Sequence, residues 1–277
     1  MNREHWVSPF RRWSFILAIS ILAQGCAIPP DPNDRLAMAE YEEVNDPFEH
    51  GNRGIFMFNR IVDRMALKPA ATAYRDHLPT LLTGRVRNVL NNFRAPVIFL
   101  NDLLQGEVPR ALQTLSRFVV NSTIGLVGLF DMASAMDMEG HDEDFGQTLA
   151  VWGVPEGPFI MLPVFGPSNP RDTLGKVVDF LIDPLRIWAS NSNRDWVPFV
   201  RAGTQAVDRR SGTLDLLNDV EKSSLDFYAA IRSLYRQRRA NAISNGRAGP
   251  VRPVPGIGEQ SGPVLNTDEA LSRSNLR

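Results

Sequence analysis

Residues 145–170 read FGQTLAVWGVPEGPFIMLPVFGPSNP and carry a single charge, Glu156, in 26 residues. The composition suggests a membrane span, but four internal prolines forbid a regular helix across the segment, because each lacks an N–H donor and clashes with the preceding turn. They are Pro155, Pro158, Pro163 and Pro167. An open loop in hydrocarbon would leave backbone groups without hydrogen-bond partners. The segment therefore cannot span a bilayer alone. It is a connection buried in the core, a segment at a membrane interface, or the lining of a cavity.

Apolar residues elsewhere in the chain recur at helical spacing, on one face every three or four positions. The pattern covers residues 55–65, 86–93, 112–119 and 174–181, and residues 96–104 are apolar on nearly all sides. A further helix is expected over 220–240, with Leu225, Tyr228, Ile231 and Tyr235 on one face. Alternating, strand-like runs are nearly absent. The sequence predicts an all-α protein with several helices of about 10–20 residues.

The first 26 residues are typical of a bacterial lipoprotein signal. Three arginines precede an uncharged run of ten residues at 14–23, which is too short to cross a bilayer, since a spanning helix needs about 20, and which has the length of a signal-peptide core. Residues 22–26, LAQGC, resemble a lipobox, although Ala23 stands where leucine is usual. We expect cleavage after residue 25 and lipidation of Cys26, and Ala27 favours sorting to the outer membrane. The alternative is a free or buried thiol in an ordinary secreted protein.

Charge and cysteine content exclude several classes of protein. The chain has 277 residues with 30 Lys+Arg against 31 Asp+Glu, and loss of residues 1–25 leaves 27 against 30, a net charge of −3. A nucleic-acid binder would show a basic patch and a high pI. With one cysteine, the chain can form neither an intramolecular disulfide nor a cysteine-based zinc site.

The chain divides into a signal peptide (1–25), a lipidated tether (26–46), a helical domain (47–243) and a tail (244–277). The tether is rich in proline and then acidic. The tail is rich in proline and glycine and lacks aromatic residues, a composition typical of disorder.

Signatures of catalysis and of metal binding are absent from the sequence. It contains no G-x-S-x-G nucleophile elbow, no P-loop and no H-E-x-x-H. The run His141–Asp144 has metal-ligand character, but an acidic run in a loop is usually solvated surface. We therefore predict no metal, no cofactor and no enzymatic activity.

Four motif blocks, in order, resemble the MlaA/VacJ family of outer-membrane lipoproteins. The residues that carry the resemblance are Asn45, Asp46, Pro47, Asn52, Arg53 and Asn59, then Gln105 and Gly106, then Asn121 and Gly125, and finally Phe145, Gly146, Gly153, Gly157, Pro158, Leu162, Pro163, Gly166, Arg171 and Asp172. The blocks cover roughly residues 45–240, and the tail falls outside them.

The resemblance implies a fold and a function. Such proteins form a ring-like, donut-shaped single domain of short amphipathic helices in the inner leaflet of the outer membrane. They remove mislocalised phospholipids from the outer leaflet through an amphipathic channel and pass them to a periplasmic phospholipid carrier of the MlaC type. They associate with a trimeric porin, and this step involves no cofactor.

The resemblance also implies roles for two segments. Met57 and Phe58 match a gating segment where changes cause uncontrolled lipid flow, and Asp131–Gly140 matches a hinge loop that governs channel opening. From the residues themselves, the arginines at 232–239 are candidates for contact with a carrier or a headgroup. Two other functions stay open: a lipoprotein-anchored interfacial phospholipid hydrolase, and a porin adaptor without its own lipid path.

Overall fold

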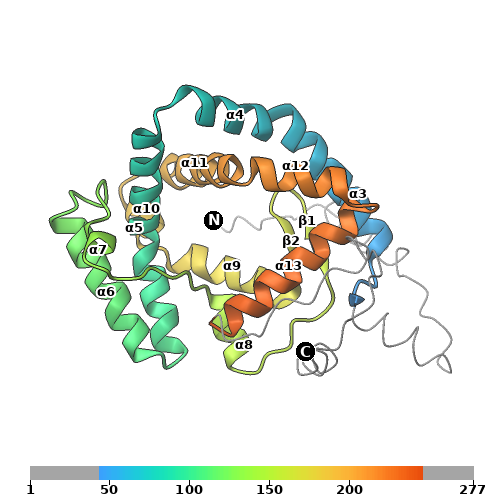
Figure 1. Ribbon diagram of the computed structural model, residues 1–277. Helices are drawn as coiled ribbons and strands as arrows, with labels where there is room; N and C mark the ends of the chain where they lie inside the picture. The colour runs from blue at the N-terminus through green and yellow to red at the C-terminus, as the bar shows by residue number, and fades with distance from the viewer. Residues whose placement is uncertain (1–43, 246–277) are drawn as a thin grey trace, which may run out of the picture.

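Most of the described part of the chain, residues 44–245, is helical in the computed structural model (Figure 1). Cys26, the signal peptide 1–25, and nearly all of the tether and of the tail lie outside the described residues. The elements follow in the order α3 (Glu49–Val62), η1 (Asp63–Leu67), α4 (Lys68–His77), α5 (Thr80–Leu104), α6 (Val108–Thr123), α7 (Met132–Ala135), α8 (Phe145–Val151), β1 (Ile160–Leu162), β2 (Gly166–Ser168), α9 (Pro170–Ile182), α10 (Pro184–Asn191), α11 (Trp196–Gly212), α12 (Leu214–Ser223) and α13 (Phe227–Ile243).

The helices are arranged around a central opening (Figure 1). The π-helical turn η1 joins α3 and α4 into one curved arc on the upper side of the view, and α5 descends from the end of this arc. The chain returns through α8, α9 and α10, and α11 to α13 complete the ring. The expected all-α, ring-like fold is confirmed. In the described part of the chain, every helix is either too short or too polar to cross a membrane.

The two apolar stretches at 86–93 and 96–104 belong to the single 25-residue helix α5, which continues through Pro96. Proline inside a helix removes one hydrogen bond without always ending the helix. At its end α5 turns at Gly106, whose φ of 77° suits glycine, and pairs with α6.

The last helix was expected to run unbroken over 220–240, and this prediction is wrong. Residues 224–226 separate α12 from α13, and Leu225 is 97% exposed. The carboxylate of Asp226 accepts hydrogen bonds from the N–H groups of Tyr228 (3.0 Å) and Ala229 (3.2 Å). An aspartate in this position starts a new helix because it satisfies donors that have no partner within the helix.

Segment 145–170 forms α8, a loop and the antiparallel hairpin β1–β2, in which Met161 pairs with Pro167. Phe159 and Met161 are buried with Tyr228 in the apolar core, whereas Val164 and Phe165 are 69% and 77% exposed. Part of the segment is thus a core connection, and its tip presents apolar side chains to the surroundings.

Glycines allow α8 and α9 to approach closely. A Cβ atom at Gly175 would lie 2.3 Å from the backbone nitrogen of Gly146, so any larger residue would push the two helices apart. This contact holds the lower side of the ring together.

Candidate functional site

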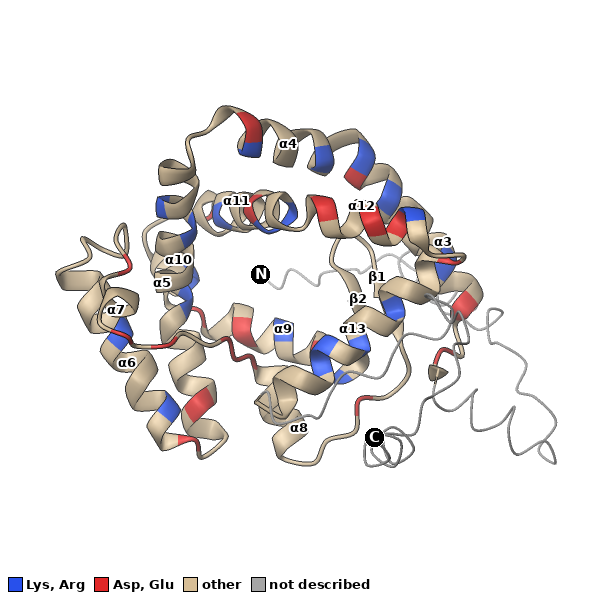
Figure 2. Ribbon diagram, viewed as in Figure 1, with Lys and Arg blue, Asp and Glu red and all other residues tan. Residues whose placement is uncertain are grey.

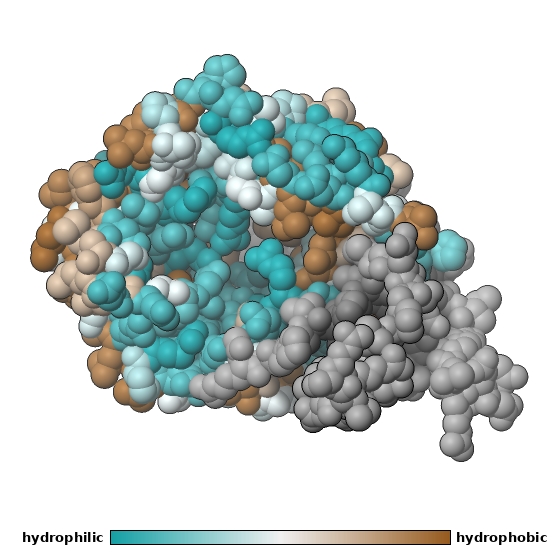
Figure 3. Space-filling model, viewed as in Figure 1, coloured by the Kyte–Doolittle hydropathy of each residue, from teal (hydrophilic) through white to brown (hydrophobic). Residues whose placement is uncertain are grey.

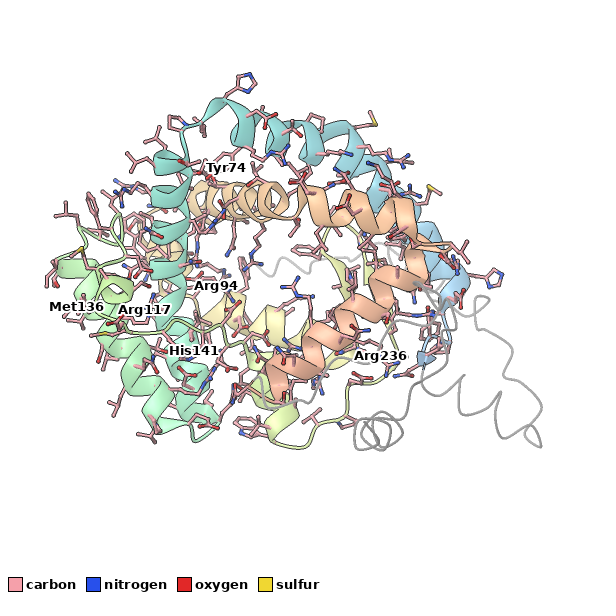
Figure 4. All side chains as sticks on the ribbon, in the orientation of Figure 1. Tyr74, Arg94, Arg117, Met136, His141 and Arg236 are labelled. Atoms are coloured by element: carbon pink, nitrogen blue, oxygen red, sulfur yellow. The ribbon has the colours of Figure 1, made fainter. Side chains whose placement is uncertain are left out.

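A cavity of about 400 Å³ lies between α5 and α6, beneath the loop that connects α7 to α8. Its walls come from α5, α6, α11 and that loop, and most of the lining side chains are polar. They are Asn88, Asn91, Asn92, Arg94, Ala95, Ile98, Thr114, Arg117, Phe118, Asn121, Asp131, Gly140, His141, Asp142 and Arg209. Figure 4 shows Arg94, Arg117 and His141 on these elements, and Figure 3 shows the molecule hollowed at its centre, with hydrophilic residues around the hollow.

One face of α5 supplies the largest wall of the cavity. Asn88, Asn91, Asn92 and Ala95 recur at the spacing of neighbours on one side of a helix. Asn92 donates to the Ser122 hydroxyl at 3.0 Å, which ties α5 to α6. The remaining amides of this face can offer donors and acceptors to a bound molecule.

The predicted hinge loop, Asp131–Gly140, is anchored on this cavity and contains the short helix α7. Arg117 of α6 donates to both carboxylate oxygens of Asp131, at 3.1 Å each, and also to the Met138 carbonyl. Burial opposes ionisation of Asp131, but hydrogen bonds from Ser134 and Asn121 and the charge of Arg117 outweigh it, so the pKa of Asp131 is lowered. The loop is therefore held at one end by a charged, bidentate contact.

His141, at the other end of the loop, contacts Asp102 and Thr114 through the same ring nitrogen. Its Nε2 atom lies 3.0 Å from the Asp102 carboxylate and 3.2 Å from the Thr114 hydroxyl. A catalytic triad uses opposite ring nitrogens for the nucleophile and the carboxylate. Thr114 also donates directly to Asp102 at 2.8 Å. The three side chains therefore tie α5 and α6 to the loop and do not have the nucleophile–base–carboxylate geometry of a triad.

The acidic run after His141 is solvated surface only at Asp142, whose side chain is 63% exposed. Glu143 is 1% exposed and accepts hydrogen bonds from Arg110 (2.8 Å) and Gln105 (2.9 Å), while Asp144 pairs with Arg239 at 2.6 Å. Burial raises the pKa of Glu143. Among residues 44–245, no cluster of three or more His, Cys, Asp or Glu side chains could hold a metal ion.

The first motif block fixes the hairpin to α3. Asn45 donates to the Gly157 carbonyl at 2.7 Å, and the side chains of Asn52 and Asn59 bond the backbone of residues 159–164. Asp46 is buried and accepts from Tyr228, from Asn52 (2.8 Å) and from Arg232 (2.8 Å). These residues build the scaffold and do not line the cavity.

The arginines at 232–239, predicted to contact a carrier or a headgroup, are mostly engaged inside the protein. Arg232 pairs with Asp46, Arg236 with Glu156 at 3.2 Å, and Arg239 with Asp144 and Asp172. Their positive charges hold α13 against the segment before α3, the loop before β1 and the N-terminal ends of α8 and α9. Only Arg238 of this group has an exposed guanidinium without a hydrogen bond or ion pair to the described residues.

Three of the motif and hinge-loop residues line the cavity, Asn121, Asp131 and Gly140, and so do His141 and Asp142 of the acidic run. The other motif residues lie in turns and contacts around it. Gly106, Gly153, Gly157 and Gly166 have positive φ. The cavity residues Arg94 and Arg209 were missed. The polar spacing along α5 could have indicated Arg94, whereas nothing near Arg209 in the sequence distinguishes it.

Large apolar side chains are exposed over much of the ring's exterior. Met57 and Phe58, the predicted gating segment, are about half exposed (52% and 49%). On α6 the exposed residues follow one face of the helix, and on α9 the same holds; they are Val108, Leu112, Leu115 and Val119, and Leu174, Val177 and Leu181. Many buried side chains are polar instead, including Asn101, Asp102, Thr148 and Asp172. Figure 3 shows apolar residues along the left and lower outer edges and mostly polar residues around the hollow, with some apolar residues on its right side.

Comparisons with known proteins agree with the resemblance seen in the motifs. The family model described as MlaA lipoprotein matches residues 44–242. An uncharacterized protein of Rickettsia prowazekii is 35% identical over 201 residues, which cover 72% of this chain and 78% of that protein. The intermembrane phospholipid transport system lipoprotein MlaA of Haemophilus influenzae is 33% identical over 237 residues, covering 83% of this chain and 90% of the relative.

A solved structure shares the fold. It comes from work on the structural basis for maintenance of bacterial outer membrane lipid asymmetry, and it matches with a TM-score of 0.65 and 29% identity. The match covers 72% of this chain and 98% of that chain. The motif blocks, the ring of helices and the matched family model all agree, and the chain therefore belongs to the MlaA lipoprotein family.

Proposed function

We propose that the protein is an outer-membrane lipoprotein that takes mislocalised phospholipids from the outer leaflet and passes them through its ring to a periplasmic carrier of the MlaC type. The proposal rests on a distribution of polarity that is the reverse of that in an ordinary soluble protein. Apolar residues face outward from the ring, and asparagine, arginine and aspartate side chains line the cavity. The Haemophilus influenzae relative is named as a phospholipid transport lipoprotein, which supports the same substrate class here.

The exterior suits immersion in one leaflet. Exposed apolar patches of this extent on a soluble monomer would mark a site of interaction or a liability to aggregate. Acyl chains of the inner leaflet would cover the outward faces of α6 and α9, and the ring's short helices would lie in that leaflet without crossing the bilayer. A trimeric porin would border part of the same exterior.

The cavity suits an amphipathic substrate. Its volume of about 400 Å³ falls in the range of small-molecule sites, about 300–1,000 Å³, which accommodates a headgroup with its glycerol. Ile98 and Phe118 provide apolar contacts next to the asparagines. Because transfer breaks no bond, the step needs neither a nucleophile nor a metal, and His141 with Asp102 and Thr114 serves to hold the loop.

Mass spectrometry of the purified full-length protein tests this function. We expect intact diacyl phospholipid to co-purify with it. Lysophospholipid with free fatty acid would instead favour a hydrolase, and a lipid-free protein that still binds porin would favour an adaptor. Anchoring is tested separately by Cys26→Ala, which should release the chain from the outer membrane, and retention would contradict a lipid anchor at this residue.

A further inference from the structure

Arg209 of α11 lines the cavity, and its guanidinium makes no hydrogen bond, ion pair or ring contact within residues 44–245. Most other arginines of this part of the chain pair with a carboxylate, as Arg117 does with Asp131 and Arg210 with Asp63. Arg209 therefore lacks the carboxylate partner that Arg210, the next residue in the chain, has in Asp63.

Two further arginines lie near Arg209. Arg94 belongs to α5 and lines the same cavity (Figure 4), and Arg238 belongs to α13. Burial and the charge of Arg94 lower the pKa of Arg209, and the charge of Arg238 acts in the same direction, against the opposing charges of Asp142 and Asp208. Figure 2 shows lysine and arginine positions on several of the separate helices that surround the central opening.

The nearby carboxylates neutralise these cations only in part. Asp208 is buried and already bound by Arg87 through two hydrogen bonds, of 3.1 Å and 3.0 Å. Asp142 pairs with Arg94 at 2.9 Å, but its side chain is 63% exposed. Because the Asp142 side chain is largely exposed, solvent screens its attraction to Arg94, so an incoming anion can compete with Asp142 for that guanidinium.

We propose that Arg94 and Arg209 form a binding site for the phosphodiester group of a phospholipid, with Asp142 as the built-in counter-ion that the phosphate displaces and Arg238 adding positive potential. The planar guanidinium of an arginine can donate two parallel hydrogen bonds to two oxygens of a phosphate group, which a lysine ammonium cannot do. The site deepens the proposed function and rests on it for the lipid part of the assignment. Because Asp142 lies two residues beyond the predicted hinge loop, Asp131–Gly140, its displacement would also loosen the end of that loop while a headgroup is bound.

Binding of dihexanoylphosphatidylglycerol, a short-chain soluble phospholipid, to the purified full-length protein tests the site. Arg209→Gln should weaken binding about tenfold, which corresponds to about 1.4 kcal/mol. Arg75→Gln is the matched control, since Arg75 pairs with Asp76 and Asp215 on the exposed surface of α4, and it should leave binding unchanged. Asp142→Asn should strengthen binding severalfold because it removes the competing carboxylate, a gain that damage to the fold would not produce.

The outcomes separate this site from the proposed function. Unchanged binding in Arg209→Gln and in Asp142→Asn, with the wild type still binding the lipid, would overturn the site and leave the function standing. No binding by the wild type would count against the function itself. Inorganic phosphate should compete weakly; if it binds as tightly as the lipid, with the same dependence on Arg209, the site is one for free phosphate and the headgroup assignment is overturned.

Discussion

Asn52 and Asn59 lie two turns apart on the same face of α3, and each uses its side-chain amide to bond both a carbonyl and an N–H of the hairpin. Asn52 donates to the Phe159 carbonyl at 3.1 Å and accepts from the Met161 N–H at 2.8 Å. Asn59 donates to the Leu162 carbonyl at 2.9 Å and accepts from the Val164 N–H at 2.7 Å. The two amides make hydrogen bonds to the backbone around β1 of the kind that a neighbouring strand would make. They thereby fix the position of α3 along the hairpin.

Asn52→Ala should lower the free energy of unfolding by about 2–3 kcal/mol, because it leaves buried backbone groups of Phe159 and Met161 without partners. Urea unfolding of the protein in detergent measures this. Asn59→Ala should cost less, about 1 kcal/mol, since water reaches Val164. The control is Asn241→Ala, at an exposed position on α13. Equal stability of Asn52→Ala and the control would refute the role given to Asn52.

Deletion of Met57 and Phe58 should let phospholipid flow outward into the outer leaflet. Removal of two residues rotates everything after them by about 200° around the helix, so Asn59 would leave the hairpin. The double substitution Met57→Ala/Phe58→Ala keeps the register and removes only the exposed side chains. We expect outer-leaflet phospholipid to rise in cells with the deletion and to rise much less in cells with the double substitution. An unchanged outer leaflet in the deletion strain would speak against this segment as a gate.

Arg117→Ala should release the hinge loop. The substitution removes the bidentate contact with Asp131 and the bond to the Met138 carbonyl, so local opening of residues 131–142 becomes easier. Hydrogen exchange of these amides should accelerate about tenfold or more, which corresponds to about 1.4 kcal/mol. Arg75→Ala serves as the control on a surface ion pair. Exchange rates in the loop that match those of the control would show that other contacts, such as His141 with Asp102, suffice to hold it.

The free energy of unfolding should depend on pH because the carboxyl group of Asp179 ionises differently in the folded and the unfolded state. Burial raises its pKa to about 6 from an ordinary value of 3.8, against the opposing hydrogen bonds from the Phe145 N–H and from Asn101. The folded state therefore binds the proton more tightly than the unfolded state does. The cost of the buried charge is present above pH 6 and is relieved as the pH falls from about 6 to about 4.

The comparison variant is Asp179→Asn, which is neutral throughout. The wild type should gain up to about 2 kcal/mol of unfolding free energy relative to this variant between about pH 7 and pH 4.5. Unfolding in urea at a series of pH values measures the difference. A difference that stays constant with pH, or one that falls as the pH is lowered, would show that Asp179 is not destabilised by its charge.

The all-α class could be predicted because helical periodicity is local. Leu112, Leu115 and Val119 share one face of α6, as their spacing indicates, although that face is exposed and not part of a core. Spacing shows that residues share a side of a helix, but it cannot show whether that side meets protein or lipid. The helix boundary at 224–226 was missed because the capping carboxylate of Asp226 competes with an apolar pattern that continues across it.

The site was only partly predictable. The motif and hinge-loop predictions include Asn121 and Asp131, which line the cavity, whereas most motif residues hold the hairpin, α8 and α9 together. Arg94 and Arg209 lie on helices more than one hundred residues apart in the chain. Asp142 lies near them because the loop between α7 and α8 runs along the same cavity. The burial of Glu143 depends on Arg110 and Gln105, which the acidic run itself does not reveal.

If phospholipid passes through the ring by way of the cavity between α5 and α6, filling that cavity should block transport, and this tests the proposed function most directly. Asn91→Trp would occupy the polar wall, and Leu112→Trp, on the exposed face of α6, is the matched control. The measurement is the amount of phospholipid in the outer leaflet of cells whose own copy of the protein has been replaced by each variant. We predict that Asn91→Trp raises it to the level of a deletion strain while Leu112→Trp leaves it at the wild-type level. A wild-type outer leaflet in cells with a stably inserted Asn91→Trp protein would contradict the claim.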